Sequence, residues 1–246
     1  MKLYGWEQKY REILREFGFD RKDDTRAANL LNLLVSIRLP LNKLDHEIKN
    51  RVVFVIGAGP SLSPSIPAIK RFKKATKIVA DGATRALIEN GFRPDIVVTD
   101  LDGNLEYLKK ASEMNAVMVV HSHGDNIGIL PIASLFRNCI GTTEGKQFGK
   151  IKNFGGFTDG DRCAFLARYF GAKRIILFGM DFGSKIGAYS KEGRYDKAVK
   201  LQKLRKARYL LEWLASKDSR ELYTTSEPIK GFQNISFGDL QGLVSE

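Results

Sequence analysis

Short apolar runs alternate with longer amphipathic stretches along most of the chain. The runs are rich in valine and isoleucine and are bounded by glycine, proline or charged residues, which is typical of strands buried on both faces of a parallel sheet. We expect strands at residues 52–56, 77–80, 96–98, 116–120, 139–140, 174–179 and 221–224. Strands that alternate with helices predict an α/β fold with a doubly wound, mostly parallel, Rossmann-like sheet.

The N-terminal part of the chain has a different pattern. Apolar side chains recur at helical spacing over residues 6–17, and Gly18 is suited to end that helix. Asp23-Asp24-Thr25 predicts the start of a second helix, which Pro40 would break. The sequence therefore divides into an N-terminal helical segment (1–50), an α/β domain that would carry any catalytic site (51–225) and a C-terminal tail (226–246).

Carboxylates follow two predicted strands at the point where each strand ends. The run at 77–80 is followed by Asp81, and the run at 96–98 is followed by Asp100 and Asp102. The carboxyl ends of parallel strands meet at one edge of an open α/β sheet, where ligands bind. Such a cluster repels itself unless a cation neutralises it, and oxygen ligands favour Mg²⁺, which in turn indicates a phosphate-bearing substrate.

Three more aspartates have comparable positions. Asp125 follows the run at 116–120, so we expect it at the same edge of the sheet. Asp159 and Asp161 open a predicted helix, where an acidic residue commonly acts as a cap. One helix cap requires only one aspartate, so both Asp159 and Asp161 are candidate metal ligands.

A glycine-rich turn follows the first predicted strand. Gly57, Gly59, Pro60 and Ser61 lie between this strand and a predicted helix, where backbone N–H groups can approach a phosphate. Leu62 occupies the place of the third glycine in the dinucleotide fingerprint, so a generic nucleotide or phosphate loop fits better. A tight turn without a ligand remains the alternative.

Two further polar segments follow predicted strands. Thr142, Thr143 and Lys146 supply hydroxyls and a cation that suit phosphate oxygens, although an ordinary polar loop has the same composition. His121 and His123 lie on one face of a strand end, where they have the geometry to share a transition metal. Hydrogen bonding or substrate positioning explains such a pair equally well, and both interpretations stay open.

The net charge and the cysteine content restrict the classes of binding partner and the cellular location that we expect. The formal net charge is +12 and the pI is about 9.6, which suits nucleotides, phosphorylated metabolites or nucleic acid. A predicted helix at 195–216 is most basic at 197–208, but no aromatic-interleaved RNA motif accompanies it, which disfavours nucleic acid. Cys139 and Cys163 are isolated, no secretory signal is recognised, and no apolar run suits a membrane. We expect a cytoplasmic protein with no membrane partner, and the sequence leaves a homo-oligomer open.

Single motifs point to three classes of enzyme. The stretch Asp100-Leu101-Asp102-Gly103 resembles the opening motif of haloacid-dehalogenase-type phosphatases, although Asn104 stands where that family has Thr or Ser. Asp-x-Asp at a strand end is also similar to the metal motif of nucleotide-sugar glycosyltransferases. A longer frame that includes Asp81-Gly82 and Pro94-Asp95 resembles the thiamine pyrophosphokinase pattern, with Thr99 in place of its Gly and Gly103 in place of its Ser.

The combined motifs resemble one family more specifically. They are GAGPSL at 57–62, ADGATRALIENGFRPDIVVTDLDG at 80–103, HSHGDN at 121–126 and GGFTDGDRCAFLARYFGAKRIILFGMDFG at 155–183. This set is similar to the archaeal 6-hydroxymethyl-7,8-dihydropterin diphosphokinases, which are related to thiamine pyrophosphokinase and share its fold type. The resemblance implies Mg²⁺-dependent transfer of diphosphate from ATP to the hydroxymethyl group of the reduced pterin, with release of AMP.

The resemblance also implies roles for the candidate residues. Asp100 and Asp102 would hold Mg²⁺, with Asp159 or Asp161 completing the site, while Asp81 or Asp125 would orient the substrate hydroxyl or accept its proton. Other residues would contact the nucleotide and its phosphates: Gly57, Gly59, Pro60, Ser61, Thr142 and Thr143 as its binding loops, and Arg85 and Lys146 as phosphate clamps.

Overall fold

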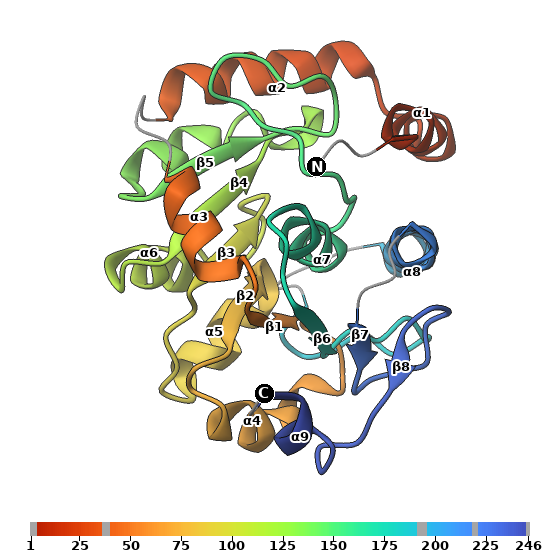
Figure 1. The fold of residues 1–246 in the computed structure, drawn as a ribbon. Helices are drawn as coiled ribbons and strands as arrows, with labels where there is room; N and C mark the ends of the chain where they lie inside the picture. The colour runs from red at the N-terminus through yellow and green to blue at the C-terminus, as the bar shows by residue number, and fades with distance from the viewer. Residues whose placement is uncertain (1–3, 36–39, 191–195, 218–220, 245–246) are drawn as a thin grey trace.

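The α/β fold expected from the sequence is confirmed by a computed structural model, which describes residues 4–35, 40–190, 196–217 and 221–244. The eight strands among these residues form one sheet in the order β5-β4-β3-β2-β1-β6-β7-β8, and all neighbouring strands are parallel (Figure 1). The strands are β1 (Val52–Ile56), β2 (Thr76–Ala80), β3 (Ile96–Thr99), β4 (Val117–His121), β5 (Cys139–Thr142), β6 (Arg174–Phe178), β7 (Glu221–Thr224) and β8 (Gln233–Asn234).

Helices cover both faces of the sheet because the apolar side chains of each strand alternate between the two faces. In β1, Val53 and Val55 belong to the core on one face, and Phe54 and Ile56 to the core on the other. The first face carries α1 (Trp6–Phe17), α3 (Leu41–Ile48), α7 (Asp159–Tyr169) and α8 (Lys197–Ser216). The second face carries α4 (Leu62–Arg71), α5 (Asp81–Glu89), α6 (Leu105–Glu113) and α9 (Leu240–Val244). Near the edge strand β5 lie α2 (Arg21–Leu34) and the 3-10 helices η1 (Gly124–Asn126) and η2 (Leu130–Leu135).

The strand order reverses between β1 and β6. The chain passes outward from β1 through β2, β3 and β4 to β5, and then returns to place β6 on the other side of β1. In open α/β sheets the crevice outside the carboxyl ends of two such strands is the usual ligand site. The turns after β1 and β6 meet here, since Gly59 N–H donates to the carbonyl oxygen of Gly179 at 2.8 Å.

The N-terminal segment has three described helices where the sequence predicted two. The helix that ends at Gly18 is confirmed, and Gly18 has the left-handed φ of 68° that favours glycine there. The second helix begins at Arg21 rather than near Asp23, because the side chain of Asp20 accepts from Lys22 N–H and caps it. Pro40 precedes the third helix, α3.

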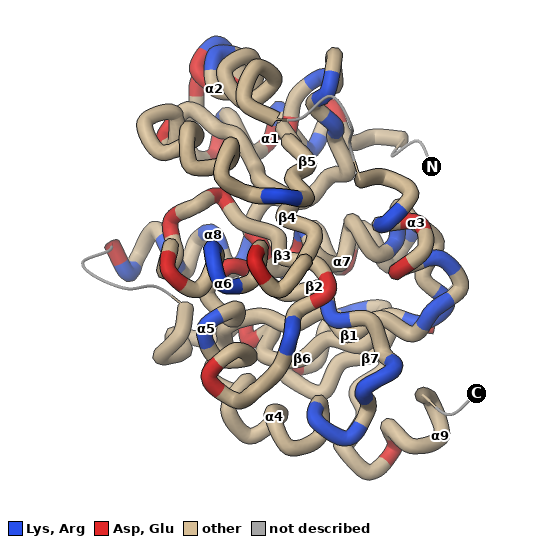
Figure 2. Tube along the Cα trace, turned by 90° about the vertical axis from the view of Figure 1, so that its left-hand side faces the viewer, with Lys and Arg blue, Asp and Glu red and all other residues tan. Residues whose placement is uncertain are grey.

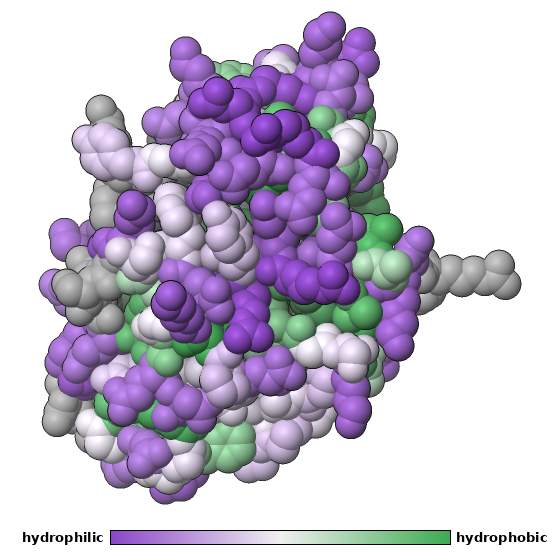
Figure 3. Space-filling view, turned by 90° about the vertical axis from the view of Figure 1, so that its right-hand side faces the viewer, coloured by the Kyte–Doolittle hydropathy of each residue, from purple (hydrophilic) through white to green (hydrophobic). Residues whose placement is uncertain are grey.

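The C-terminal part differs from the prediction at two places. The segment 226–244, which the sequence left without assigned structure, adds β8 and α9 to the α/β fold, and Leu240 is buried. Helix α8 begins at Lys197, and Val199 and Tyr209 of the expected apolar stripe are exposed. Helix α1 lies beside α8, where the Trp6 and Trp213 rings are 6.4 Å apart. The surface of the molecule seen from the right-hand side of Figure 1 is largely hydrophilic (Figure 3). Among the described residues, no helix is long and apolar enough to cross a membrane.

Candidate active site

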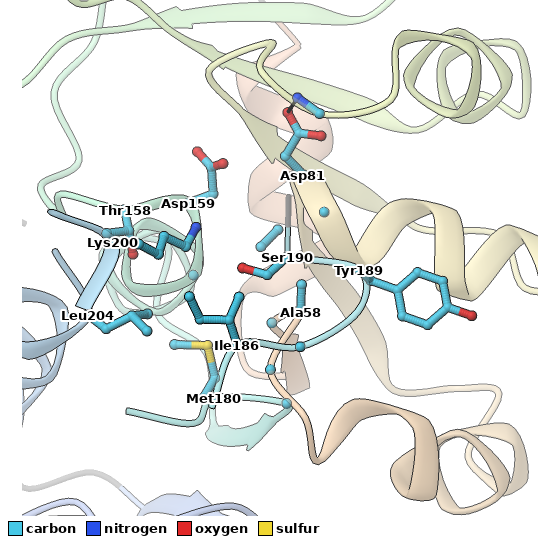
Figure 4. A pocket seen from close by; sticks show the side chains of 18 of the residues that line it. Ala58, Asp81, Thr158, Asp159, Met180, Ile186, Tyr189, Ser190, Lys200 and Leu204 are labelled. Carbon is cyan, nitrogen blue, oxygen red and sulfur yellow. Dashed lines mark hydrogen bonds between the residues drawn. The ribbon is translucent and has the colours of Figure 1, made fainter. Parts of the chain in front are cut away.

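Four aspartates converge at the carboxyl edge of the sheet. Asp81 follows β2, Asp100 and Asp102 follow β3, and Asp159 opens α7. One carboxylate oxygen from each lies within 4.8 Å of the others. Asp81 and Asp159 point toward the same pocket (Figure 4). The structure thus brings together four of the aspartates selected from the sequence, in one group suited to a hard cation.

The turn after β3 is built to bring its carboxylates close to Asp81. Leu101 has a left-handed φ of 70°, and its N–H donates to the Thr99 hydroxyl at 2.7 Å. That hydroxyl in turn donates to Asp81. A Cβ atom at Gly103 would lie 1.8 Å from Asp81 Oδ1, so only glycine fits at this position. The thiamine pyrophosphokinase pattern has Ser at this position. Gly103 in its place is consistent with the close approach of Asp81.

Burial and mutual repulsion of the carboxylates favour the binding of a cation. Burial raises the pKa of Asp81 to about 7, and the charges of Asp100 and Asp102 add to this. Burial, followed by the charges of Asp100 and Asp81, raises the pKa of Asp159 well above its usual range. Among the described residues, Asp81 Oδ1 and Asp159 Oδ1 are buried without a hydrogen-bond partner. A buried carboxylate oxygen without a donor is costly, and a divalent cation held among the carboxylates would offset that cost.

Two basic side chains stand behind the carboxylates. His123 Nε2 lies 3.5 Å from Asp100, and its Nδ1 accepts from Asp125 N–H, so the proton is assigned to Nε2. Burial would raise the pKa of Asp100, but His123 and Arg162 together hold it below its usual range. The buried Arg162 guanidinium lies 3.6 Å from Asp159 and also donates to Glu144.

The two histidines do not form a shared metal site among the described residues. Their ring centroids are 6.2 Å apart, and each contacts a different carboxylate. His121 Nε2 is 3.7 Å from Glu144, whereas His123 faces Asp100. The arrangement favours the positioning interpretation of this pair.

The raised pKa of Asp81 gives a prediction about stability. Near neutral pH the folded, metal-free protein retains a proton that the unfolded chain, with an ordinary aspartate pKa, has released. Stability is therefore lost as the pH rises through about 7. We expect Asp81 to lower the free energy of unfolding in EDTA by about 1.4 kcal/mol between about pH 6 and about pH 8, in addition to the contribution of Glu144, whose pKa burial also raises to about 7. Denaturant titrations with and without Mg²⁺ would measure this decline, which both Mg²⁺ and Asp81→Asn should reduce by the Asp81 contribution. A stability in EDTA that is constant or rises with pH would contradict the prediction.

Lysines that sequence analysis missed complete the pocket. Lys185, Lys200 and Lys203 line it together with Gly57, Gly59, Arg85 and the four clustered aspartates. Lys200 reaches into it near Asp159 (Figure 4). Lys200 and Lys203 lie three positions apart on one face of α8, and this spacing within the basic helix was the signal that could have identified them.

Several residues predicted for the site lie elsewhere. Asp125 and Lys146 are exposed and outside the pocket lining. Thr142 and Thr143 are buried and line a separate small cavity beside His121. Hydrogen bonds within strand pairs explain this burial, because the Thr142 hydroxyl donates to the Val120 carbonyl at 3.0 Å.

Asp161 is also turned away from the carboxylate group. Its side chain accepts from the N–H groups of Phe157 and Thr158 and from the Thr158 hydroxyl, at 2.6 to 2.8 Å. These bonds fix the start of α7, so the cap explains Asp161 and leaves Asp159 for the cluster.

The glycine-rich turn is part of the pocket wall, but three of its amides already donate to groups of the protein. Gly57 N–H donates to Phe178 and Gly59 N–H to Gly179, both at 2.8 Å. Ser61 N–H donates to Asp181 at 2.9 Å, and neither Ser61 nor Pro60 lines the pocket. This pattern favours the tight-turn interpretation over a phosphate cradle at these amides.

Comparison with known proteins gives consistent matches over most of the chain. The family model described as 6-hydroxymethylpterin diphosphokinase MptE-like matches residues 28–187. A protein of Pyrococcus furiosus named 6-hydroxymethyl-7,8-dihydropterin pyrophosphokinase is 46% identical over 222 residues, which cover 87% of this chain and 94% of the relative. Proteins of the same name from Methanocaldococcus jannaschii and Methanothermobacter thermautotrophicus are 40% and 42% identical, cover 88% and 87% of this chain, and are themselves covered to 97% and 95%.

A solved structure shares the fold at low sequence identity. The MAf glycosyltransferase from Magnetospirillum magneticum AMB-1 matches with a TM-score of 0.59 and 15% identity, over 86% of this chain. This chain spans 39% of that larger protein, and the likeness concerns the fold alone.

Proposed function

The chain belongs to the 6-hydroxymethylpterin diphosphokinase MptE-like family, and we propose on that basis that its four-carboxylate pocket transfers diphosphate from ATP to 6-hydroxymethyl-7,8-dihydropterin with Mg²⁺. The protein is a diphosphokinase acting on a reduced hydroxymethylpterin. ATP as the donor and Mg²⁺ as the ion are the finer parts of the proposal. The observation that carries them is the cluster of Asp81, Asp100, Asp102 and Asp159, with two buried oxygens lacking donors.

The four aspartates fit a Mg²⁺ site by their chemistry. All offer oxygen ligands, and Asp102 is exposed, which leaves an open side toward the pocket. When bound, the ion would neutralise charge on the phosphate oxygens during transfer. His123 and Arg162 would keep Asp100 and Asp159 in place behind it.

Asp81 is the best-placed group to receive the proton of the substrate alcohol. In the proposed reaction the hydroxymethyl oxygen bonds to the β-phosphorus, the bond from that phosphorus to the α,β-bridging oxygen breaks, and AMP leaves. The alcohol proton must go to a base whose pKa lies near the working pH. Burial gives Asp81 a pKa of about 7 without metal, and its Oδ1 has no hydrogen-bond partner among the described residues. In this role Asp81 would stand beside an ion held by Asp100, Asp102 and Asp159, with Oδ1 left for the alcohol proton.

The lysines of α8 are proposed to hold the phosphates of the nucleotide. Lys200→Ala is expected to raise the KM for ATP by about 10- to 100-fold, because a charge-assisted bond to phosphate is lost. Lys197→Ala is the matched control, since Lys197 is exposed on the same helix and outside the pocket lining. Steady-state kinetics with varied ATP would measure the effect. An equal change in both variants would indicate a general loss of charge and contradict the assignment.

The basic surface gives little support to the alternative of nucleic-acid binding. On the side viewed in Figure 2, acidic and basic residues are interspersed along the chain. A nucleic-acid site is typically a stripe of one sign. Lys200 and Lys203 of the basic helix line the carboxylate pocket instead.

A product assay tests the proposed function. Purified protein is incubated with ATP and Mg²⁺ and with either the reduced hydroxymethylpterin or thiamine, and the nucleotide products are separated. We expect AMP and the pterin diphosphate with the first acceptor only. AMP with thiamine alone would move the activity to the thiamine pyrophosphokinase type, and ADP in place of AMP would contradict diphosphate transfer.

A further inference from the structure

The pocket has an apolar end as well as the carboxylate end. Met180, Ile186 and Leu204 line it, and their side chains are grouped together in Figure 4. Met180 is buried, and its sulfur would lie 2.6 Å from a Cβ at Gly57 and 2.9 Å from a Cβ at Gly160. It therefore fills the space that these two glycines leave and forms the floor. Ile186 and Leu204 are only half-buried, so they offer apolar surface to a flat ring.

Among the described residues that line the pocket, one carboxylate lies outside the metal group. Asp181 follows Met180 and also lines the pocket. Its Oδ2 accepts from Ser61 N–H at 2.9 Å and from the Ser61 hydroxyl at 2.8 Å, at the start of α4. A Cβ atom at Gly59 would lie 2.2 Å from Oδ2, so the turn after β1 admits the carboxylate only because glycine stands there.

The contacts of Asp181 leave one of its oxygens unused. Both hydrogen bonds fall on Oδ2, and among the described residues the side chain makes no other hydrogen bond. A role in capping α4 accounts for Oδ2 alone. Asp181 lines the pocket and Ser61 fixes its Oδ2, which leaves Oδ1 available to accept from a donor-rich edge of a ring.

We infer that this apolar end binds the pterin ring and that Asp181 is its specificity-determining residue, an assignment that rests on the proposed function. The pterin edge carries a 2-amino group next to a ring N–H, so it presents adjacent donors to the carboxylate. Adenine presents a donor next to a ring nitrogen lone pair, which an ionised carboxylate repels. The pterin therefore takes this end, and the adenine of the nucleotide lies outside it.

Ligand discrimination tests this assignment. The probes are 6-hydroxymethylpterin, whose fluorescence reports binding, and 6-hydroxymethyllumazine, which has an oxygen in place of the 2-amino group. Wild-type protein with Mg²⁺ should bind the pterin at least about 100-fold more tightly than the lumazine, because the lumazine oxygen faces a carboxylate. Asp181→Asn should lose most of this ratio, since an amide can donate to the lumazine oxygen, while its affinity for ATP stays within about twofold.

Two variants separate specificity from structure. Glu227→Gln is the matched control, because Glu227 accepts from Phe182 N–H at 3.2 Å, close to Asp181 in sequence, but lies outside the pocket lining, so its discrimination should be unchanged. Asp181→Glu keeps the charge and displaces it, and should lose part of the ratio. Thermal unfolding of each variant shows that it is folded under the assay conditions.

The outcomes distinguish this inference from the proposed function. If wild type converts the pterin and Asp181→Asn and Asp181→Glu both keep the full discrimination, the assignment is overturned and the function stands. A loss of ATP affinity in place of pterin affinity also overturns it. If wild type neither binds the pterin nor uses it as an acceptor, the function and this inference fall together.

Discussion

Replacing Asp100 with asparagine is expected to lower kcat by about 10³-fold or more, because the variant loses a charged ligand of the ion that the transferred phosphates require. Asp100 lies in the four-carboxylate group and is fixed from behind by His123 at 3.5 Å. Asparagine has the same shape, so the effect comes from charge. The substitution relieves repulsion within the cluster but also removes the favourable interaction of Asp100 with His123 and Arg162, so thermal unfolding without metal is the check that the variant is folded.

Asp125→Asn is the matched control for this variant. Asp125 carries the same functional group and contacts the other side of His123, yet its side chain is 68% exposed and outside the cluster. Its kcat should stay within about twofold of wild type. Turnover at saturating ATP and pterin, followed by AMP release, would measure both variants. Normal turnover in Asp100→Asn would remove Asp100 from the proposed metal site.

Arg162→Met is expected to destabilise the folded protein by about 3–5 kcal/mol, because it leaves buried carboxylates without their cation. The Arg162 guanidinium contacts both Glu144 and Asp159, and all three side chains are at most 16% exposed. Burial raises the pKa of Glu144 to about 7, although Arg162 opposes this. Without Arg162, Glu144 would take up a proton or remain as an unpaired buried charge.

Two comparisons isolate the charge effect of Arg162. Arg205→Met makes the same exchange at an exposed position of α8 and should change the free energy of unfolding by less than about 0.5 kcal/mol. Adding Glu144→Gln to Arg162→Met should recover part of the lost stability, since one buried charge is removed. Chemical denaturation would measure all variants. A loss in Arg162→Met no greater than in Arg205→Met would contradict a central role for this ion pair.

The fold and most of the cluster could be predicted because both depend on short-range signals. Short apolar runs, most of them rich in valine and isoleucine, marked seven of the eight described strands, and the two-residue β8 was too short to give a pattern. Once the strands were placed, parallel topology required Asp81, Asp100 and Asp102 to share an edge. Asp159 joined them because α7 begins at that same edge.

The remaining residues depend on tertiary geometry. Asp159 and Asp161 are alike in sequence, and only the hydrogen bonds of Asp161 to the start of α7 separate the ligand candidate from the cap. The basic sequence of α8 is compatible with solvent exposure or with nucleic-acid binding. Only the position of the helix in the fold places Lys200 at the pocket. Thr142 ends the edge strand β5 and Lys146 follows it, and this strand is too far along the sheet for the pocket at the β1–β6 reversal.

Binding of a divalent ion to the four carboxylates is the central claim, and a titration with Mn²⁺ in place of Mg²⁺ tests it most directly. Electron paramagnetic resonance counts the free Mn²⁺ while AMP release is followed in the same samples. We expect saturable binding that rises together with turnover in wild type, and loss of both in a variant with Asp100→Asn and Asp102→Asn. Unchanged Mn²⁺ binding in that variant, or full turnover of wild type in EDTA, would contradict the account.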